Sequence, residues 1–168
     1  SSISGNIESL NSMTKLTAID LGDTNITGDI ENLGLLQQLT KIDIGKTNIT
    51  GNIESLMNLS NLTVIRICYL DPNDHGVTGN IDFLNQMSNL TVIDFHNNKN
   101  ISGDITLLGS LQNLTVINLD DTGVTGDIEN LKSLLNLTYL NLAATKVTGN
   151  IEHLNSLLNL TYLNLAAT

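Results

Sequence analysis

Residues 114–136 read LTVINLDDTGVTGDIENLKSLLN, and residues 137–159 read LTYLNLAATKVTGNIEHLNSLLN. The two stretches carry leucine, isoleucine or valine at matching places and share a central Thr-Gly pair. A unit of this length cannot bury its own apolar side, so it becomes stable only when neighbouring units stack and share one core. The pair therefore predicts an array of stacked units instead of a globular domain.

The unit recurs along nearly the whole chain. The glycine that follows Thr or Ser recurs after 23, 23, 28, 24, 23 and 23 residues, at Gly5, Gly28, Gly51, Gly79, Gly103, Gly126 and Gly149. The leucine that opens each unit keeps the same intervals from Leu16 to Leu160. We predict full repeats at 16–38, 39–61, 62–89, 90–113, 114–136 and 137–159, with partial repeats at 1–15 and 160–168. Because the sequence begins and stops inside the pattern, we expect a segment of a longer array.

Both quoted units fit L-x-x-(I/L)-x-L-x-x-T-x-(I/V)-T-G-x-I-x-x-L-x-x-L, and this pattern resembles the leucine-rich-repeat family. The resemblance implies a right-handed solenoid of the α/β class, shaped like a horseshoe. It places a parallel β-sheet on the concave face and short 3-10 or irregular turns on the convex face. The Gly-x-Ile half is similar to arrays in bacterial, microbial and phage proteins. It is more loosely similar to plant-type repeats, whose usual Pro is mostly replaced here by Glu or Asp. These likenesses favour an extracellular or cell-surface location.

The residues themselves support this architecture. Ile117 and Leu119 alternate with outward-facing neighbours, as in a strand that is buried on one side. Ile128, Leu131 and Leu134 then recur at intervals of three, which suits a short 3-10 turn on the opposite side. The repeated glycine predicts a tight bend between the two halves, where a Cβ would be strained.

The ninth place of the unit is mostly threonine, at Thr24, Thr47, Asn98, Thr122 and Thr145. In the family that this chain resembles, asparagine usually occupies this place and bonds the backbone of neighbouring turns. A threonine hydroxyl can perform part of that task. We therefore interpret this column as structural.

Composition limits the classes of partner. With 17 acidic and 7 basic residues the net charge is −10, which disfavours binding to nucleic acid or to anionic lipid. Cys68 is the single cysteine, so no internal disulfide can form. The sequence also shows no apolar run of membrane-span length and no opening signal peptide, so we expect no membrane insertion.

Motifs for catalysis, cofactors or metals are lacking in the sequence. The three histidines, His75, His96 and His153, do not share a repeat position. A column of carboxylates occurs on the expected outer side, at Glu31, Glu54, Asp82, Glu129 and Glu152. One carboxylate per repeat is too few for a Ca²⁺ ligand set, so we expect a solvated acidic stripe. We predict a protein that is not an enzyme and holds no cofactor.

The outward side of the predicted sheet is the candidate binding surface. One column, called the polar column here, contains Asp20, Asp43, Arg66, Asp94, Asn118, Asn141 and Asn164. A neighbouring mixed column contains Ala18, Lys41, Val64, Val92, Val116, Tyr139 and Tyr162. Because strands lie about 4.8 Å apart, each column forms a ladder across the face. Such ladders could hold a protein or a glycan, with His96 at the strand edge and the tyrosines supplying stacking area. Each polar residue could instead be merely solvated.

Repeat 62–89 carries five extra residues within the stretch CYLDPNDHGV. We expect Tyr69, Asp71, Asp74 and His75 to protrude at the sheet edge. Insertions in repeat proteins often serve recognition, although solenoids also tolerate inert ones.

Two functions remain open from sequence. One is a recognition module that binds protein or glycan through the concave face and the 70–76 loop. The alternative is a structural spacer that stacks end to end, with further repeats or another chain at its ends. Nine Asn-x-Ser/Thr sequons also occur, at Asn25, Asn48, Asn58, Asn61, Asn89, Asn100, Asn113, Asn136 and Asn159. Because the Asn-Leu-Thr triplet belongs to the repeat pattern, most of these sequons need no glycan to explain them.

Overall fold

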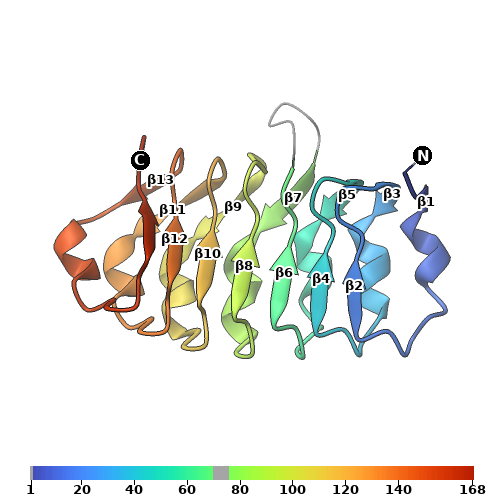
Figure 1. Cartoon of the computed structure of the whole chain (residues 1–168), viewed down its shortest axis with the longest axis horizontal. Helices are drawn as coiled ribbons and strands as arrows, with labels where there is room; N and C mark the ends of the chain where they lie inside the picture. Colours follow the sequence, from blue (N-terminus) through green and yellow to red (C-terminus); the bar gives the residue numbers. More distant parts are fainter. Residues whose placement is uncertain (1, 70–75) are drawn as a thin grey trace.

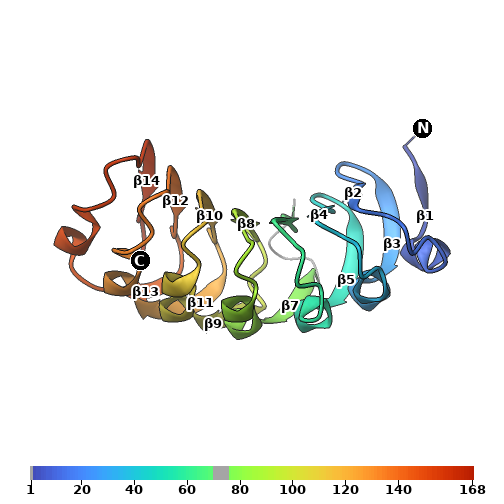
Figure 2. The ribbon, with the colours of Figure 1, turned by 90° about the horizontal axis from the view of Figure 1, so that it is seen from below.

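The computed structural model describes residues 2–69 and 76–168 as a curved solenoid. Each complete turn contributes a strand to one sheet, a strand to a second sheet and a 3-10 turn. Figure 2 shows the first sheet on the inner side of the arc and the 3-10 turns on the outer side. The expected concave sheet and convex short turns are therefore confirmed.

The concave sheet has seven parallel strands whose neighbours follow the order of the repeats. They are β2 (Ala18–Asp20), β4 (Lys41–Asp43), β6 (Val64–Arg66), β8 (Val92–Asp94), β10 (Val116–Asn118), β12 (Tyr139–Asn141) and β14 (Tyr162–Asn164). The register keeps equivalent residues side by side, as in the pairing of Ile65 with Ile93. The polar and mixed columns are therefore continuous ladders on this sheet.

A second seven-stranded parallel sheet lies behind the concave sheet, and the repeat pattern does not predict it. Its strands are β1 (Ser4–Asn6), β3 (Asn25–Asp29), β5 (Asn48–Asn52), β7 (Val77–Asn80), β9 (Ile101–Asp104), β11 (Gly123–Asp127) and β13 (Lys146–Thr148). Each of these strands is shifted by two residues against its neighbour, so that Thr27 lies beside Asn48. The reason is that these strands are short and most contain a glycine, which gives a weak strand signal in the sequence.

The convex side is built from short 3-10 turns. They are η1 (Ile7–Leu10), η2 (Ile30–Leu35), η3 (Ile53–Leu56), η4 (Ile81–Gln86), η5 (Ile105–Ser110), η6 (Ile128–Leu131) and η7 (Ile151–Leu154). An Asn or Asp precedes each turn, and its side-chain oxygen accepts a hydrogen bond from the backbone N–H two residues later. In the described part of the chain, no helix is long and apolar enough to cross a membrane.

The repeated glycine does more than permit a bend. Gly126 has a φ of +112°, a conformation that L side chains rarely adopt. A Cβ there would also overlap Oδ1 of Asp104, the residue that caps η5 in the preceding turn. The glycine of one turn therefore makes room for the capping side chain of the turn before it.

The core consists of one continuous stack of aliphatic side chains. Ile117, Leu119, Leu131 and Leu134 are fully buried, and equivalent residues lie above and below them in neighbouring turns. Phe95 is the largest side chain among the fully buried ones. Small aliphatic residues repeated at fixed places therefore supply the burial that a globular domain obtains from larger aromatic side chains.

The threonine column is structural, but its bonds differ from the expectation. Thr47 donates to the carbonyl of Ile44 at 2.7 Å, and Thr122 donates to the carbonyl of Leu119 at 2.6 Å. Both bonds close a turn within one repeat, because a single short hydroxyl reaches only its own turn. Asn98 bonds the carbonyl of Phe95 at 3.0 Å and also that of Ile67 in the preceding repeat. The bridge between repeats therefore needs the longer amide.

Candidate binding surface

The first half of the concave face carries paired charges. The ammonium group of Lys41 lies 3.5 Å from a carboxylate oxygen of Asp20, and the guanidinium group of Arg66 lies 3.9 Å from Asp43. Each pair joins neighbouring strands of the concave sheet. Because these groups are partly exposed, the pairs contribute little stability and remain available to a partner.

His96 stands near the centre of the face, just after β8. Its Nδ1 atom lies 2.6 Å from Oδ1 of Asp94 and 3.1 Å from Nδ2 of Asn118. The hydrogen bond to Asp94 raises the pKa of His96, and partial burial opposes this rise. The structure thus groups three predicted site residues, and it gives the centre of the face a group whose charge depends on pH.

The far end of the face carries two tyrosines. The rings of Tyr139 and Tyr162 are stacked, with centroids 4.3 Å apart and planes at 5°. Burial and the neighbouring Tyr162 raise the pKa of Tyr139. Because each ring covers one face of the other, the pair offers a partner less ring face than the expected stacking platform. The ring edges and hydroxyl groups of the two tyrosines remain accessible to a partner.

The amide end of the polar column is less accessible than expected. Asn141 is only 5% exposed, and its Oδ1 accepts a hydrogen bond from the backbone N–H of Ala143 at 3.1 Å. The equivalent bond in the last turn joins Asn164 to Ala166. Asn141 therefore holds the turn after β12 in place and is a poor contact residue.

A third column of residues, beside the polar and mixed columns, creates a hollow. Gly22 and Gly45 occupy it after β2 and β4, and Cys68 follows after β6. The glycines help to line a depression of about 280 Å³ that is bordered by Asp20, Asp23, Asp43, Lys46 and Arg66. A Cβ on Gly45 would overlap the Sγ atom of Cys68, which explains the glycine. Two glycines at one repeat place were the signal that could have revealed this hollow.

The Cys68 thiol borders the same hollow. Burial raises its pKa, and the nearby carboxylates of Asp94 and Asp43 raise it further. Because the thiolate is the reactive form of cysteine, this environment disfavours Cys68 as a nucleophile.

The prediction for Tyr69 is wrong. Its side chain is only 7% exposed, and its hydroxyl donates to the carbonyl of Ile49 at 3.3 Å. The Tyr69 ring packs into the apolar interior beside Gly76, because the glycine has no Cβ to obstruct it. Asp71, Asp74 and His75 lie outside the described residues.

The acidic column is more than a solvated stripe. Oε1 of Glu54 accepts from the backbone N–H of Asn80 at 3.1 Å, and Oδ1 of Asp82 accepts from that of Asp104 at 3.3 Å. These carboxylates therefore link successive turns. Within residues 2–69 and 76–168, no group of three or more His, Cys, Asp or Glu is arranged to hold a metal ion.

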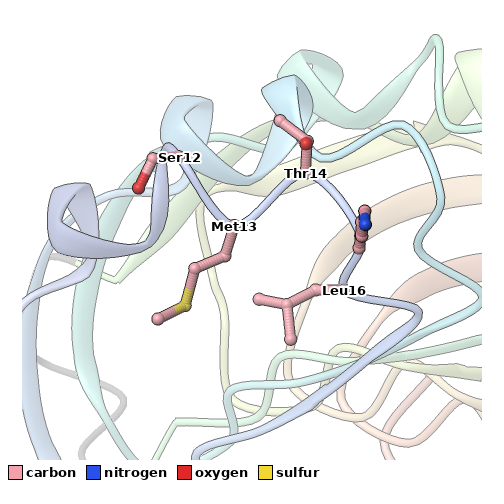
Figure 3. A pocket seen from close by; sticks show the side chains of 5 residues that line it. Ser12, Met13, Thr14 and Leu16 are labelled. Atoms are coloured by element: carbon pink, nitrogen blue, oxygen red, sulfur yellow. The ribbon is translucent and has the colours of Figure 1, made fainter.

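The two ends of the solenoid expose apolar side chains. Figure 3 shows Met13 and Leu16 beside a depression of about 390 Å³ in the first turn. Met13 is 51% exposed, whereas its equivalents in the next turns are buried core residues. In the last turn Ile151 is 62% and Leu163 is 40% exposed. These residues occupy core positions of the first and last described turns.

No family model matches the sequence, and no curated protein matches it. Among solved structures, the Arabidopsis receptor kinase HAESA, in complex with the peptide hormone IDA and the co-receptor SERK1, superposes with a TM-score of 0.80 at 28% identity. The plant peptide hormone receptor RGFR1, in complex with RGF2, superposes with a TM-score of 0.74 at 25% identity. Internalin C2 of Listeria monocytogenes reaches 0.70 at 24% identity.

The chain has a leucine-rich-repeat fold.

The superposed region spans 97% of this leucine-rich-repeat chain but only 28% of the HAESA chain. For RGFR1 the figures are 96% and 30%, and for internalin C2 they are 97% and 77%. The chain therefore corresponds to part of a longer array in the two plant receptors.

Proposed function

We propose that this leucine-rich-repeat array is a non-enzymatic recognition module that binds a protein partner through its concave face. This proposal rests on the contrast between the inward and the outward residues of the concave strands. The inward residues of the concave strands are uniformly isoleucine or leucine, whereas the outward residues change from repeat to repeat among charged, aliphatic, amide and aromatic types. A scaffold needs the first property, and a surface that recognises one partner needs the second.

A protein or peptide suits this face better than a glycan. The stacked tyrosines present edges and hydroxyl groups more than ring faces, and sugar recognition by stacking would need the faces. Arginine and tyrosine at the centre of an interface commonly dominate protein binding, and the face holds Arg66 and Tyr139. The two plant receptors with the same fold are solved with peptide hormones, which supports a peptide as partner here.

The hollow at Gly22 and Gly45 is a suitable place for an anchoring side chain of the partner. Three carboxylates and two basic groups border it, so a partner side chain with either charge finds an opposite charge there. The excess of carboxylates, together with the net charge of −10, favours a basic side chain.

The test is selection of binders from a displayed library of random peptides, because the partner is unidentified. We expect Asp94→Ala, Arg66→Ala and Tyr139→Ala each to weaken the selected binders by about tenfold or more, in line with interface anchors. Glu31→Ala on the convex side is the matched control and should change nothing. Binders that respond to Glu31→Ala but to none of the three concave changes would contradict the proposal, as would a folded array that selects no peptide.

Deletion of residues 71–75 tests the contribution of the inserted loop separately. We propose that this loop extends the concave face, as its turn-rich sequence suggests. Loss of the selected binders on deletion, with the thermal melt preserved, would support the loop as a contact. Unchanged affinity would remove it from the binding surface.

We further propose that the array acts outside the cell or on its surface. The ectodomain of the plant membrane receptor kinase GASSHO1/SCHENGEN3 shares this fold, with 28% identity and a TM-score of 0.73. Antibodies raised against the array should label intact cells of the source organism or its medium. Labelling only after permeabilisation would contradict this location.

A structural spacer is the second candidate function. Residues 137–145 and 160–168 are identical, as in a spacer built from copies, and the last turn exposes Ile151 and Leu163 at 62% and 40%. End-to-end stacking would bury these side chains. Sedimentation should then show a mass that rises with protein concentration and falls again in Leu163→Asp. A monomer at every concentration would exclude stacking by the isolated array.

A further inference from the structure

The nine sequons of the chain are not equivalent in the folded protein. Four asparagines donate their side-chain amide to a backbone carbonyl of the preceding repeat: Asn89 to Ser60, Asn113 to Ser88, Asn136 to Gln112 and Asn159 to Leu135. The donor–acceptor distances lie between 2.9 and 3.1 Å. We call these four the closed sequons.

The central leucine and the threonine of each closed sequon also contact the core or the preceding repeat. In the sequon of Asn113, the central Leu114 is fully buried, and the hydroxyl of Thr115 donates to the carbonyl of Thr91 at 3.1 Å. The sequon of Asn136 repeats this arrangement with Leu137 and Thr138. All three residues of the motif therefore contact the preceding repeat or the core.

All nine asparagines are exposed, but in the remaining five sequons the side-chain amide makes no hydrogen bond within the described part of the chain. They are those of Asn25, Asn48, Asn58, Asn61 and Asn100, and we call them the open sequons. Asn25 and Asn48 begin β3 and β5, strands of the second sheet that Figure 1 shows on one rim of the solenoid. They therefore lie off the concave face.

We propose that the fold divides the sequons into two classes of N-glycan acceptor, so that the open sequons accept a glycan and the closed sequons do not. The donor is a lipid-linked oligosaccharide diphosphate. In the transfer, the bond between the anomeric carbon and the phosphate oxygen breaks, and a bond from that carbon to Nδ2 of asparagine forms. Nδ2 releases one proton to a base of the transferase, and the lipid diphosphate leaves with the electron pair.

The direction of the hydrogen bonds explains how folding can compete with this transfer. Every bond that closes a sequon runs to the preceding repeat, which is synthesised first. A closed sequon can therefore take its final position before any later part of the chain exists. A transferase needs the asparagine amide and the threonine hydroxyl together. The hydroxyl also donates a hydrogen bond in two open sequons, through Thr27 and Thr63, so the bond of the asparagine amide is what distinguishes the closed sequons.

Asn61 supplies a matched comparison within the same chain. Its tripeptide, Asn-Leu-Thr, is identical to that of the closed sequons, and it occupies the same place in its repeat as Asn136. Thr63 donates to Thr40 in the usual way, but the amide of Asn61 has no partner in the described residues. If the tripeptide alone governed modification, Asn61 and Asn136 would behave alike.

The experiment expresses the full chain behind a secretion signal in insect cells and maps glycan occupancy site by site. After enzymatic deglycosylation, mass spectrometry identifies each modified asparagine as aspartate. We expect occupancy at Asn25, Asn48 and Asn61 to exceed that at Asn113 and Asn136 by at least fivefold. Equal occupancy in the two classes, or no glycan at any site, would overturn the proposal.

Two peptides separate the effect of the fold from that of local sequence. Peptides covering residues 22–30 and 110–118 carry an open and a closed sequon without the solenoid. With microsomal transferase and a lipid-linked donor, both should be modified at rates within about threefold. If the 110–118 peptide is not an acceptor, local sequence explains the pattern and the fold does not. In the full chain, N25Q together with N48Q should remove two glycans from the electrophoretic pattern.

Discussion

In most repeats, one residue after the concave strand adopts a left-handed backbone conformation. Asp23, Lys46, Asn97, Asp121 and Ala144 all have φ values between +52° and +63°. Asn and Asp tolerate this region because their side chains bond locally, whereas alanine is strained there. The residue is exposed at Asp23, Lys46 and Ala144 and half-buried at Asn97 and Asp121, and in every case it must adopt the left-handed conformation.

Ala144 should accordingly gain from replacement by asparagine. With φ at +52° and an exposed side chain, Ala144→Asn relieves backbone strain without disturbing the core. We expect about 1 kcal/mol of added stability, from the cost of the left-handed region to alanine. Urea unfolding followed by circular dichroism measures it. Ala18→Asn, on the exposed face of β2, is the control and should bring no gain; a loss of stability in Ala144→Asn would refute the explanation.

The hydrogen bond between His96 and Asp94 should make the stability of the fold depend on pH. The folded-state pKa of His96 is raised above the ordinary 6.5 by the hydrogen bond to Asp94. A raised pKa contributes stability that is fully present below about pH 6.5 and is lost as the pH rises through the folded-state value. The stability advantage of the wild type over Asp94→Asn should therefore be larger at about pH 6 than at about pH 8.

Nuclear magnetic resonance titration of the His96 ring provides the direct measurement. The wild type should titrate above 6.5, and Asp94→Asn should lower the midpoint. An unchanged midpoint would mean that the contact of 2.6 Å does not control the proton.

At the scale of elements, each 3-10 turn is joined to the next by a capping side chain and a glycine. The capping Asp or Asn closes its own turn and also fills the space above the glycine of the following repeat. Neighbouring repeats are therefore coupled through specific polar contacts as well as through the aliphatic core.

Gly126→Ala should break this coupling. The new methyl group would occupy a positive φ and overlap Oδ1 of Asp104, so we expect a loss of about 2–4 kcal/mol. Gly22→Ala is a suitable control, because its Cβ would meet Oδ1 of Asp20 at an ordinary 3.6 Å. Thermal melts of the two variants measure the difference. Equal melting temperatures would show that the glycine column is not needed for stacking.

At the scale of the whole molecule, a net charge of −10 is spread over a thin, elongated array. Carboxylates of successive turns lie on the same side of the solenoid, so folding brings like charges together. Exposed ion pairs, such as Lys132 with Glu129 at 3.0 Å, contribute little stability. Repulsion among the unpaired carboxylates should therefore govern the response to salt.

Stability should rise with ionic strength. Raising NaCl from about 0.01 to 0.5 M shortens the screening length from about 30 Å to a few ångströms, which weakens repulsion between turns. The unfolding midpoint in urea should increase, and Glu31→Lys should reduce the increase because it removes one like charge. A midpoint that falls with salt would show that the ion pairs outweigh the repulsion.

The sequence determined the periodic features of this protein. Spaced leucines and isoleucines fix which residues face the core, because an unburied apolar side is unstable in every unit. Ile117 and Leu119 therefore predicted a concave strand, and Ile128 and Leu131 a 3-10 turn, both of which the structure contains. The polar and mixed columns followed from the same alternation.

Tertiary structure alone decided which of these repeated side chains are exposed and free to contact a partner. In sequence, Asn141 resembles the exposed polar-column residues and Tyr69 resembles an exposed loop residue, yet their side chains are only 5% and 7% exposed. Asn61 and Asn136 share a tripeptide and a place in the repeat, but only Asn136 bonds the preceding turn. Spacing along the chain sets which way a side chain points, whereas its hydrogen bonds and exposure depend on the neighbouring turn, which folding alone brings into contact.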